Sequence, residues 1–371
     1  EVLVNAKNVL ILCNDYNAPF LSVAKEYASY LNNTDHDAIV VFLKGQKDPA
    51  IENEVSAKKV IFLEATNKEL GGFKGKLTEQ IRKLHHQYQF QFIVAHRYRA
   101  IFIATQLKDI QVFGVCHIDG NFKRLSRKLY IRFFGKNLTL IGVSKAIRDD
   151  VRKSLPFIKK EKIVHLYNSL DFETLRASLL DRSAAKKALA ISETEYCFIN
   201  VGRLHEDKDQ ATLINAFALA LPQMPQARLY IAGAGRLESA LKHQVEKLNL
   251  QEKITFLGKV PEVFRYLRAF DCFVLSSIRE GLPVALLEAY AAELPPIASL
   301  CSGNTEAIED VTEGFEVGHP EQLANLMIKR YEMSPVETNQ LIRRLNDKLE
   351  LSFTNAAVKA EFWNIVDPKT N

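Results

Sequence analysis

Short apolar runs rich in β-branched residues alternate with longer amphipathic segments along most of the chain. Such a run is typical of a buried parallel strand, and the segment after it is typical of a crossover helix. In the first half, strands are predicted at residues 8–13, 38–43, 59–64, 90–96, 112–117 and 138–144. In the second half, they are predicted at residues 196–202, 227–233, 253–258, 271–277 and 295–300. The pattern predicts two successive parallel α/β units.

The stretch between the two series marks a domain boundary. Residues 165–195 contain a turn-like HLYNSLDFE and a polar helical pattern, with no continuous strand. We therefore predict one domain at residues 1–170 and a second at residues 171–345. A chain of 371 residues also exceeds what one hydrophobic core usually supports.

The C-terminal part, residues 346–371, is predicted to be helical and to pack back on the first domain. Its segment FTNAAVKAEFWNIV places four apolar residues near one helical face. These residues are Phe353, Val358, Phe362 and Val366.

Composition narrows the class of protein. Hydrophobic residues make up 47% of the chain and charged residues 25%, which is typical of a globular protein rather than a disordered or fibrous one. No apolar run approaches the roughly 18 residues of a membrane span. The five cysteines form neither a CxxC pair nor a His/Cys cluster, which argues against a zinc site or a disulfide framework and suits a reducing cytoplasm.

Charge is unevenly placed between the halves. Residues 1–170 carry 27 Lys and Arg against 16 Asp and Glu, whereas residues 171–371 carry 22 against 28. The acidic second half argues against a nucleic-acid groove across the whole molecule, so no nucleic-acid partner is expected.

The segment SSIREGLPVALLEAY, residues 276–290, carries the first candidate chemistry. A predicted strand ends there, a turn follows, and Pro283 occupies the expected first position of a helix. Ligands bind at the carboxyl ends of strands in open α/β sheets, and a helix N-terminus favours phosphate. Glu280 could then reach a sugar and Glu288 a ribose, although the pair alone also fits a loop charge and an exposed helix residue.

A second segment strengthens this interpretation. In FINVGRLHEDKDQATL, a predicted strand is followed by Gly202, Arg203 and Lys208 in a short loop, and then by a helix. Two cations at the carboxyl end of a strand can neutralise a diphosphate leaving group.

Together these segments resemble the family 4 glycosyltransferases, and the resemblance covers nearly the whole chain. The family's Glu, seven residues, Glu motif is met by Glu280 and Glu288, and its phosphate-binding cations by Arg203 and Lys208. The resemblance implies the α/β GT-B fold, with two facing Rossmann-like domains and a cleft between them. It also implies a retaining reaction with a nucleotide-diphosphate sugar as co-substrate and no metal or other cofactor. The implied donor site comprises Gly202, Arg203, Lys208, Gly281, Leu282, Pro283, Val284 and Glu288.

The first half contains weaker matches. His117 resembles the family histidine that approaches the donor sugar, although alone it would be an ordinary residue at a strand end. With Arg203, Lys208 and Glu280 it completes the expected catalytic set. Asp119 is the only nearby carboxylate for a covalent nucleophile, and we favour attack from the leaving-group face instead.

Other matches and departures concern loops. LIGVSKAIRDDV resembles the family's strand and helix around Ser144, and residues 168–171 resemble its Asn-Gly-Val-Asp segment, with Ser169 in place of glycine. The loop CNDYNAPF lacks the family's glycine pair, so acceptor recognition is expected to use Asn14, Asp15 or Tyr16. Glu293 and Pro296 stand where the family commonly has glycine and valine, and we expect them to reshape a helix end without loss of activity.

Three motifs resemble metal or dinucleotide sites, but we assign them no such role. Residues 35–37 and 207–209 match the DxD pattern of metal-dependent transferases. The first segment lies in a polar turn, and the second lies in the loop that contains Arg203 and Lys208. Surface charge explains both, so no metal ligand is predicted. GAGR at residues 233–236 lacks the third glycine of a dinucleotide fingerprint, which argues against an NAD enzyme.

Residues 121–137 predict a basic amphipathic helix. Phe122, Leu125, Leu129 and Phe133 are expected on one face, with five cations around the rest. Such a helix either lies on an anionic membrane surface or packs its apolar face on the sheet. These alternatives stay open.

The sequence therefore predicts a cytoplasmic hexosyltransferase that could also contact the inner membrane face. It would move a hexose or N-acetylhexosamine to a glycan, with a lipid-linked or cell-surface polysaccharide acceptor as the specific expectation. A nucleotide-sugar epimerase of similar fold and a non-catalytic GT-B protein that binds a membrane or partner remain alternatives.

Overall fold

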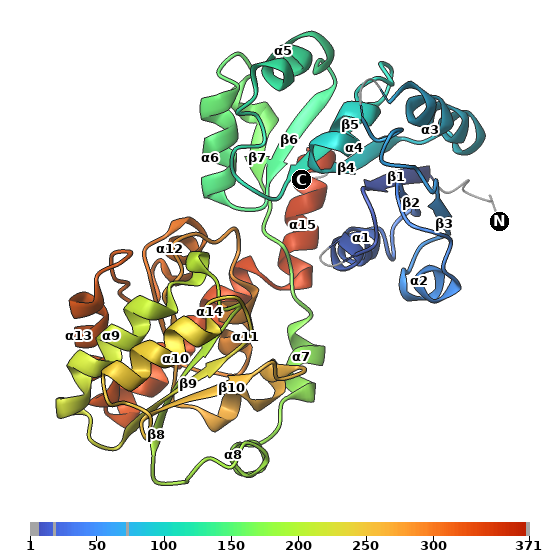
Figure 1. The fold of residues 1–371 in the computed structure, drawn as a ribbon. Helices are drawn as coiled ribbons and strands as arrows, with labels where there is room; N and C mark the ends of the chain where they lie inside the picture. Colours follow the sequence, from blue (N-terminus) through green and yellow to red (C-terminus); the bar gives the residue numbers. More distant parts are fainter. Residues whose placement is uncertain (1–6, 18–19, 72–73, 369–371) are drawn as a thin grey trace. The chain divides into compact units, whose positions relative to one another are not determined.

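The computed structural model describes residues 7–17, 20–71 and 74–368. The chain folds as two compact units (Figure 1). The first unit runs to Ser169 and takes in the chain again from Val358, and the second is Leu170–Ala357. The second domain was expected to end at residue 345. It extends further because the long helix α14 (Pro335–Ser352) buries Leu341, Leu345 and Leu349.

The first unit contains a parallel sheet in the order β3-β2-β1-β4-β5-β6-β7. Its strands are β1 (Lys7–Cys13), β2 (His36–Phe42), β3 (Lys59–Phe62), β4 (Phe92–His96), β5 (Gln111–Cys116), β6 (Leu138–Gly142) and β7 (Ile163–His165). The six predicted strands are confirmed to within a few residues at either end. The sequence pattern missed β7, which has only three residues.

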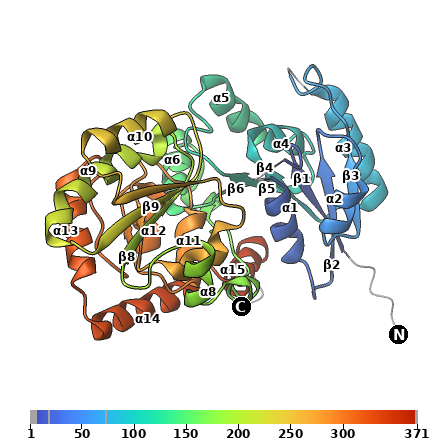
Figure 2. The same ribbon diagram turned by 60° about the horizontal axis from the view of Figure 1, so that its bottom comes forward.

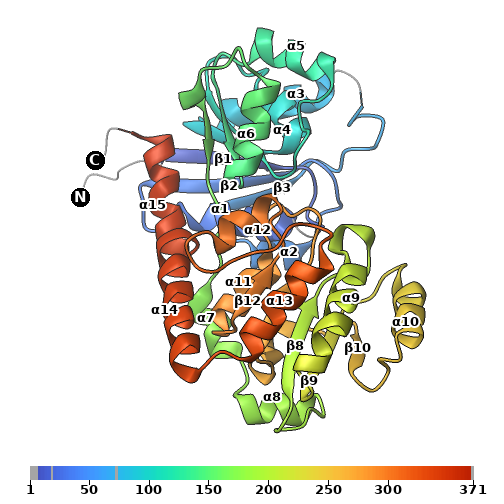
Figure 3. The same cartoon turned by 90° about the vertical axis from the view of Figure 1, so that its left-hand side faces the viewer.

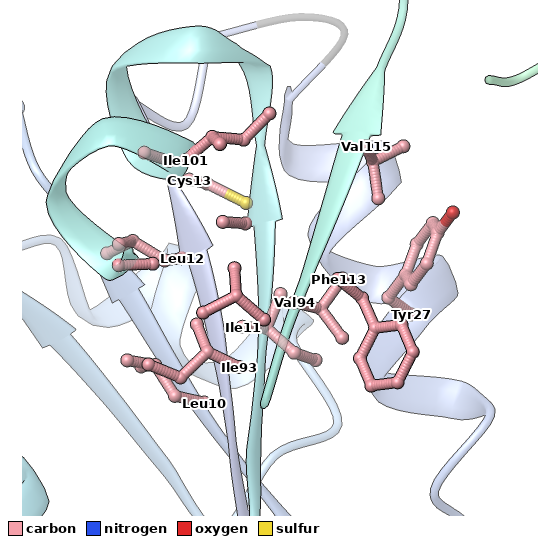
Figure 4. Close-up of a cluster of buried hydrophobic side chains, with 14 of the residues drawn as sticks. Leu10, Ile11, Leu12, Cys13, Tyr27, Ile93, Val94, Ile101, Phe113 and Val115 are labelled. Atoms are coloured by element: carbon pink, nitrogen blue, oxygen red, sulfur yellow. The ribbon is translucent and has the colours of Figure 1, made fainter. Parts of the chain in front are cut away.

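Helices cover both faces of this sheet, which is why its strands read as continuous apolar runs. They are α1 (Phe20–Ser29), α2 (Pro49–Glu54), α3 (Gly75–Tyr88), α4 (Arg97–Ala104), α5 (Leu125–Phe134), α6 (Lys145–Ser154) and α15 (Asn355–Val366), with the short η1 (Lys160–Lys162). Figure 4 shows side chains of β1, β4 and β5 gathered between Tyr27 of α1 and Ile101 of α4. Ser144 begins α6, where its hydroxyl accepts a hydrogen bond from the Ile147 amide.

Helix α15 completes the core of the first unit. Val358 and Phe362 are buried there, and the Trp363 indole donates a hydrogen bond to the Tyr30 carbonyl at 3.0 Å. Phe353 does not share this face as expected. It lies before α15, in the second unit, where its carbonyl accepts a hydrogen bond from the Leu170 amide.

Helix α5 lies at the margin of the first unit in every view (Figure 1, Figure 2 and Figure 3). The predicted apolar face of residues 121–137 is wrong at Phe122, which precedes the helix and is fully buried. Leu125, Leu129 and Phe133 share one side of α5 and are 69%, 46% and 74% exposed. We call these three residues the apolar strip of α5. Packing on the sheet does not account for them, because the buried residue of α5 is Ile131.

The second unit contains a parallel sheet in the order β10-β9-β8-β11-β12. Its strands are β8 (Tyr196–Val201), β9 (Ala227–Ala232), β10 (Ile254–Gly258), β11 (Cys272–Leu275) and β12 (Pro296–Ala298). All five were predicted. Its helices are α7 (Phe172–Ser178), α8 (Arg182–Ala188), η2 (Glu206–Lys208), α9 (Gln210–Ala220), η3 (Leu221–Gln223), α10 (Glu238–Lys247), η4 (Val263–Ala269), α11 (Val284–Ala291), α12 (Ser302–Ile308), α13 (Pro320–Tyr331) and α14. Helices α9 and α13 lie side by side in all three views, and no described helix is long and apolar enough to cross a membrane.

Candidate active site

Two neighbouring strands of the second sheet carry the candidate donor residues. Strands β8 and β11 are adjacent, although β9 and β10 separate them in sequence, so the chain reverses its direction of sheet growth between them. Arg203 and Lys208 follow β8, and Glu280 follows β11. The two loops are joined by hydrogen bonds from the Ile278 amide to the Asp207 carbonyl, 2.8 Å, and from the Ser276 hydroxyl to the Lys208 carbonyl, 2.9 Å. This is the position at which open α/β sheets bind ligands.

Lys208 and Glu280 form an ion pair with each other. Their side chains are only 20% and 12% exposed, and the same Glu280 oxygen accepts a hydrogen bond from the Ser277 hydroxyl at 2.6 Å. The pair fixes the lysine ammonium beside the carboxylate. A diphosphate that contacts Lys208 must therefore lie next to Glu280.

Arg203 is held by its backbone and not by its side chain. Its carbonyl accepts a hydrogen bond from the buried Gln210 amide at 3.0 Å, and Gln210 in turn approaches the buried Asn200. The guanidinium is exposed and has no ion-pair partner among the residues that the structure describes. Its fork is therefore available to an anionic ligand.

The loop from Glu280 to Pro283 is fixed by the start of α12. The Glu280 carbonyl accepts hydrogen bonds from the Ser302 hydroxyl, 2.9 Å, and the Gly303 amide, 3.2 Å. A Cβ on Gly303 would overlap the Gly281 carbonyl, so only glycine permits this approach. Helix α11 begins at Val284 with Pro283 as its N-cap, one residue later than expected. Leu282 lies in this loop, and Val284 contributes the first backbone amide of α11, four residues after Glu280 of the ion pair.

Glu288 lies on α11 and is partly buried. Burial raises its pKa from 4.5 to about 7, and no cation among the described residues offsets this effect. A carboxyl group that is held partly protonated near neutral pH is unusual on a helix. It is a candidate to contact ligand hydroxyl groups.

His117 belongs to the first unit and follows β5. Its Nε2 lies 3.1 Å from Nδ1 of His96, which is the last residue of β4 and is fully buried. Burial, with a smaller effect from Arg97, lowers the pKa of His117 to about 4. The imidazole is therefore neutral at physiological pH. No sequence motif singles out His96, although it ends a predicted strand as His117 does.

Both halves of the chain match known glycosyltransferase families. Residues 181–344 match the family described as Glycosyl transferases group 1, and residues 22–174 match Glycosyltransferase Family 4. An uncharacterized glycosyltransferase of Methanocaldococcus jannaschii is 30% identical over 277 residues, which covers 68% of this chain and 67% of that protein. The chain belongs to glycosyltransferase family 4.

Two further similarities bear on fold and ligands. The Escherichia coli UDP-Gal:alpha-D-GlcNAc-diphosphoundecaprenol alpha-1,3-galactosyltransferase is 28% identical over 47% of this chain, and the match spans 46% of that protein, less than half its length. The crystal structure of Anabaena HepE with UDP and glucose has a TM-score of 0.74 at 18% identity, covering 98% of this glycosyltransferase and 100% of that chain. This structural likeness shows the GT-B fold.

The aspartates of the two DxD segments have structural roles in the glycosyltransferase. Asp35 pairs with Lys7 at 2.8 Å and Asp37 with Lys58 at 2.7 Å. Asp207 pairs with Arg279 at 3.1 Å, and the Asp209 side chain caps α9. The described residues contain no cluster of three or more potential metal ligands.

The glycines of GAGR serve close packing. A Cβ on Gly233 would overlap the carbonyl oxygen of Gly202, and a Cβ on Gly235 would overlap that of Leu204. The loop after β9 thus packs directly against the backbone that carries Arg203, and the Leu204 amide donates to the Ala234 carbonyl at 3.1 Å.

The departures from the family pattern have local explanations. Glu293 adopts a left-handed backbone with φ of 60°, the conformation that favours glycine after a helix. Pro296 begins the edge strand β12, where its missing N–H is tolerated. Tyr16 packs edge-on against the rings of Phe42 and Phe62, which is a structural role.

The segment around Ser169 is fastened to α1. The Ser169 amide and the Tyr30 hydroxyl both donate to the Glu26 carboxylate. Burial raises the pKa of Glu26 to about 7. Asp171 caps α7, where it accepts a hydrogen bond from the Thr174 amide at 3.1 Å.

Proposed function

We propose that this glycosyltransferase moves a hexose or N-acetylhexosamine from a nucleoside diphosphate sugar to a lipid-linked or polysaccharide glycan acceptor, with retention of anomeric configuration. The observation that carries this proposal is the arrangement at the ends of β8 and β11. It combines an exposed Arg203 guanidinium, the Lys208–Glu280 pair and the N-terminus of α11. The named relatives that act on diphosphoundecaprenol-linked sugars, and the UDP complex of the structural relative, support uracil as the base of the donor and a lipid-linked acceptor.

The proposed mechanism relies on electrostatic stabilisation. Arg203, Lys208 and the first amides of α11 would stabilise charge that grows on the departing diphosphate. The ion pair with Glu280 keeps the Lys208 ammonium in position, and the same carboxylate would hold a sugar hydroxyl. The Glu288 carboxylate would accept hydrogen bonds from the ribose hydroxyls.

His117 of the first unit would orient the donor sugar as a neutral imidazole, because its lowered pKa leaves it uncharged at neutral pH. A donor phosphate oxygen would take the acceptor proton as the new glycosidic bond forms. Trapping of a glycosyl-enzyme adduct on Asp119 would contradict this route.

We propose that transfer requires no metal ion, because Arg203 and Lys208 would neutralise charge on the diphosphate. Initial rates should be the same with and without EDTA. Loss of activity with EDTA and recovery with manganese would overturn the assignment and would implicate the aspartates at residues 35–37 or 207–209.

Helix α5 is proposed to contact an anionic membrane surface. Its apolar strip faces solvent. Because an α-helix has 3.6 residues per turn, Lys128 and Arg132 lie beside the strip on the surface of the helix. Apolar insertion and charge attraction of about 1 kcal/mol per basic residue would act together at such a surface. This contact would bring a lipid-linked acceptor to the first unit.

The direct test is acceptor-dependent release of the nucleoside diphosphate. Purified protein is incubated with UDP-sugars, with and without a polyprenyl-diphosphate-linked sugar. Release that needs the acceptor supports transfer. Interconversion of sugars without an acceptor would indicate an epimerase, and binding without turnover would indicate a non-catalytic protein; both would contradict the proposal.

A further inference from the structure

The first unit contains a cavity of about 800 Å³ that the donor chemistry does not use. It lies at the carboxyl edge of the sheet, where its wall is formed by Asn14 after β1, by residues at the start of α4 after β4, and by residues from Ile118 to Tyr130 after β5. Strands β1 and β4 are neighbours, and the chain reverses its direction of sheet growth between them. The cavity therefore occupies the ligand position of the first sheet.

The cavity wall is strongly basic. Its described lining residues include five cations and no aspartate or glutamate: Lys74, Arg97, Arg99, Arg124 and Arg127. The hydrogen bonds of two of these arginines go to neutral oxygens, from Arg99 to the Asn14 side chain at 2.5 Å and from Arg127 to the Asn121 carbonyl at 2.7 Å. In the part of the chain that the structure describes, none of the four arginines has a carboxylate within ion-pair distance. The wall thus keeps a large positive charge.

Three of the cations lie against aromatic rings. Lys74 lies 4.5 Å from the centre of the Phe102 ring, Arg97 lies 4.4 Å from Phe20, and Arg127 lies 4.3 Å from Tyr98. A neutral ring positions the guanidinium groups of Arg97 and Arg127 without cancelling their charge.

The cations also repel one another. Burial, and then the charges of Arg99 and Arg127, lower the pKa of Lys74. The Nε of Arg97 is buried without a hydrogen-bond acceptor among the described residues, although the charge of nearby Asp15 acts on this guanidinium. Asp15 itself accepts hydrogen bonds from the Asn14 amide and the Asn17 backbone. A polyvalent anion in the cavity would relieve this repulsion.

An apolar surface adjoins the cations. Leu70, Ile118 and the stacked rings of Phe102 and Tyr130, with centroids 4.2 Å apart, line the same cavity. One side of α5 contributes Arg127 and Tyr130 to the wall, and another side presents the apolar strip to solvent. The cavity therefore suits a ligand that is both anionic and apolar.

We propose that this cavity binds the diphosphate group of a lipid-linked acceptor, with Arg97, Arg99, Arg124 and Arg127 as its ligands and the apolar wall against the first part of the lipid. A diphosphate carries charge on several oxygens, and the guanidinium fork binds phosphate oxygens in pairs. The inference rests on the proposed glycosyl transfer and names its acceptor group.

The test measures binding to the full chain by calorimetry, with farnesyl diphosphate, inorganic pyrophosphate and farnesol as probes. The variant Arg99→Gln/Arg124→Gln removes two charges from the cavity. The control Lys83→Gln/Lys153→Gln removes two charges from exposed positions of α3 and α6. Each titration is repeated with both donor-site cations replaced by alanine, so that diphosphate bound at the second unit does not contribute.

Farnesyl diphosphate should bind more tightly than pyrophosphate, and farnesol should not bind measurably. The cavity variant should weaken binding of both diphosphates about tenfold or more, because charge-assisted hydrogen bonds are lost, while the control stays close to the parent protein. Equal binding of farnesyl diphosphate by the cavity variant and its parent would overturn the proposal. Pyrophosphate that binds as tightly as farnesyl diphosphate would reduce the cavity to a free-phosphate site and overturn its lipid assignment. UDP-sugar binding should be unchanged by the cavity variant, so failure here is distinct from failure of the proposed transfer.

Discussion

Replacement of Glu288 by glutamine should raise stability and lower donor affinity at the same time. Burial raises the pKa of this carboxyl from 4.5 to about 7, so the folded protein retains a proton that the unfolded chain has released. The free energy of unfolding of the wild type should therefore fall as pH rises from about 4.5 to 7 and level off above. At about 1.4 kcal/mol per unit, this loss amounts to roughly 3 kcal/mol.

The glutamine of Glu288→Gln does not titrate, so the variant lacks this pH dependence of stability. Scanning calorimetry should show the variant more stable than wild type at about pH 8, by up to roughly 3 kcal/mol, with the difference vanishing near pH 5. UDP-sugar affinity should fall by a factor of about 10 to 100, because a charge-assisted hydrogen bond to the ribose is lost. Wild-type affinity should rise with pH through neutrality as the carboxylate forms.

The matched control is Glu26→Gln. Glu26 also has a pKa raised to about 7 by burial, but it lies in the first unit. Its replacement should remove a similar pH dependence of stability without changing UDP-sugar affinity. If Glu288→Gln alters stability as described but leaves donor affinity and its pH dependence intact, the ribose role is wrong.

Three other predictions concern single elements. Arg203→Ala and Lys208→Ala should each reduce kcat by about 100-fold or more, and the double variant should lose less than the product of the two, because both cations serve one diphosphate; multiplicative losses in initial rates would contradict this. Serine at all three positions of the apolar strip of α5 should abolish cosedimentation with phosphatidylglycerol vesicles while leaving UDP-sugar binding unchanged; retained cosedimentation would remove the strip from the membrane contact. Glu293→Gly should stabilise the second unit by up to about 1 kcal/mol in calorimetry, since the left-handed strain is relieved and is only partly offset by the flexibility of unfolded glycine; a destabilised variant would show that the side chain matters more than the backbone.

The fold was predictable because buried parallel strands have a strong signature. The eleven apolar runs identified eleven strands, whereas β7, with three residues, carries too little pattern to be distinguished from a loop. The helical period of residues 121–137 identified an apolar face but not its surroundings. Tyr130 and Ile131 turn toward the protein, whereas Leu129 and Phe133 of the predicted apolar face are exposed to solvent.

The candidate site was predictable in part. The sequence indicated which residues follow β8 and β11, but the ion pair of Lys208 with Glu280 joins positions 72 residues apart and depends on the order of strands in the sheet. The contact of His117 with His96 likewise depends on the adjacency of β4 and β5. The raised pKa of Glu288 depends on burial, which spacing alone does not show.

The proposed reaction is retaining transfer from a nucleoside diphosphate sugar to a lipid-linked acceptor. The most direct measurement follows the reaction of an α-linked UDP-sugar with a polyprenyl-diphosphate-linked sugar by proton NMR. One new α-anomeric signal should appear in the acceptor for each UDP released, and no release should occur without acceptor. A β-anomeric product, or UDP release at the same rate when the acceptor is omitted, would contradict retaining transfer to this acceptor.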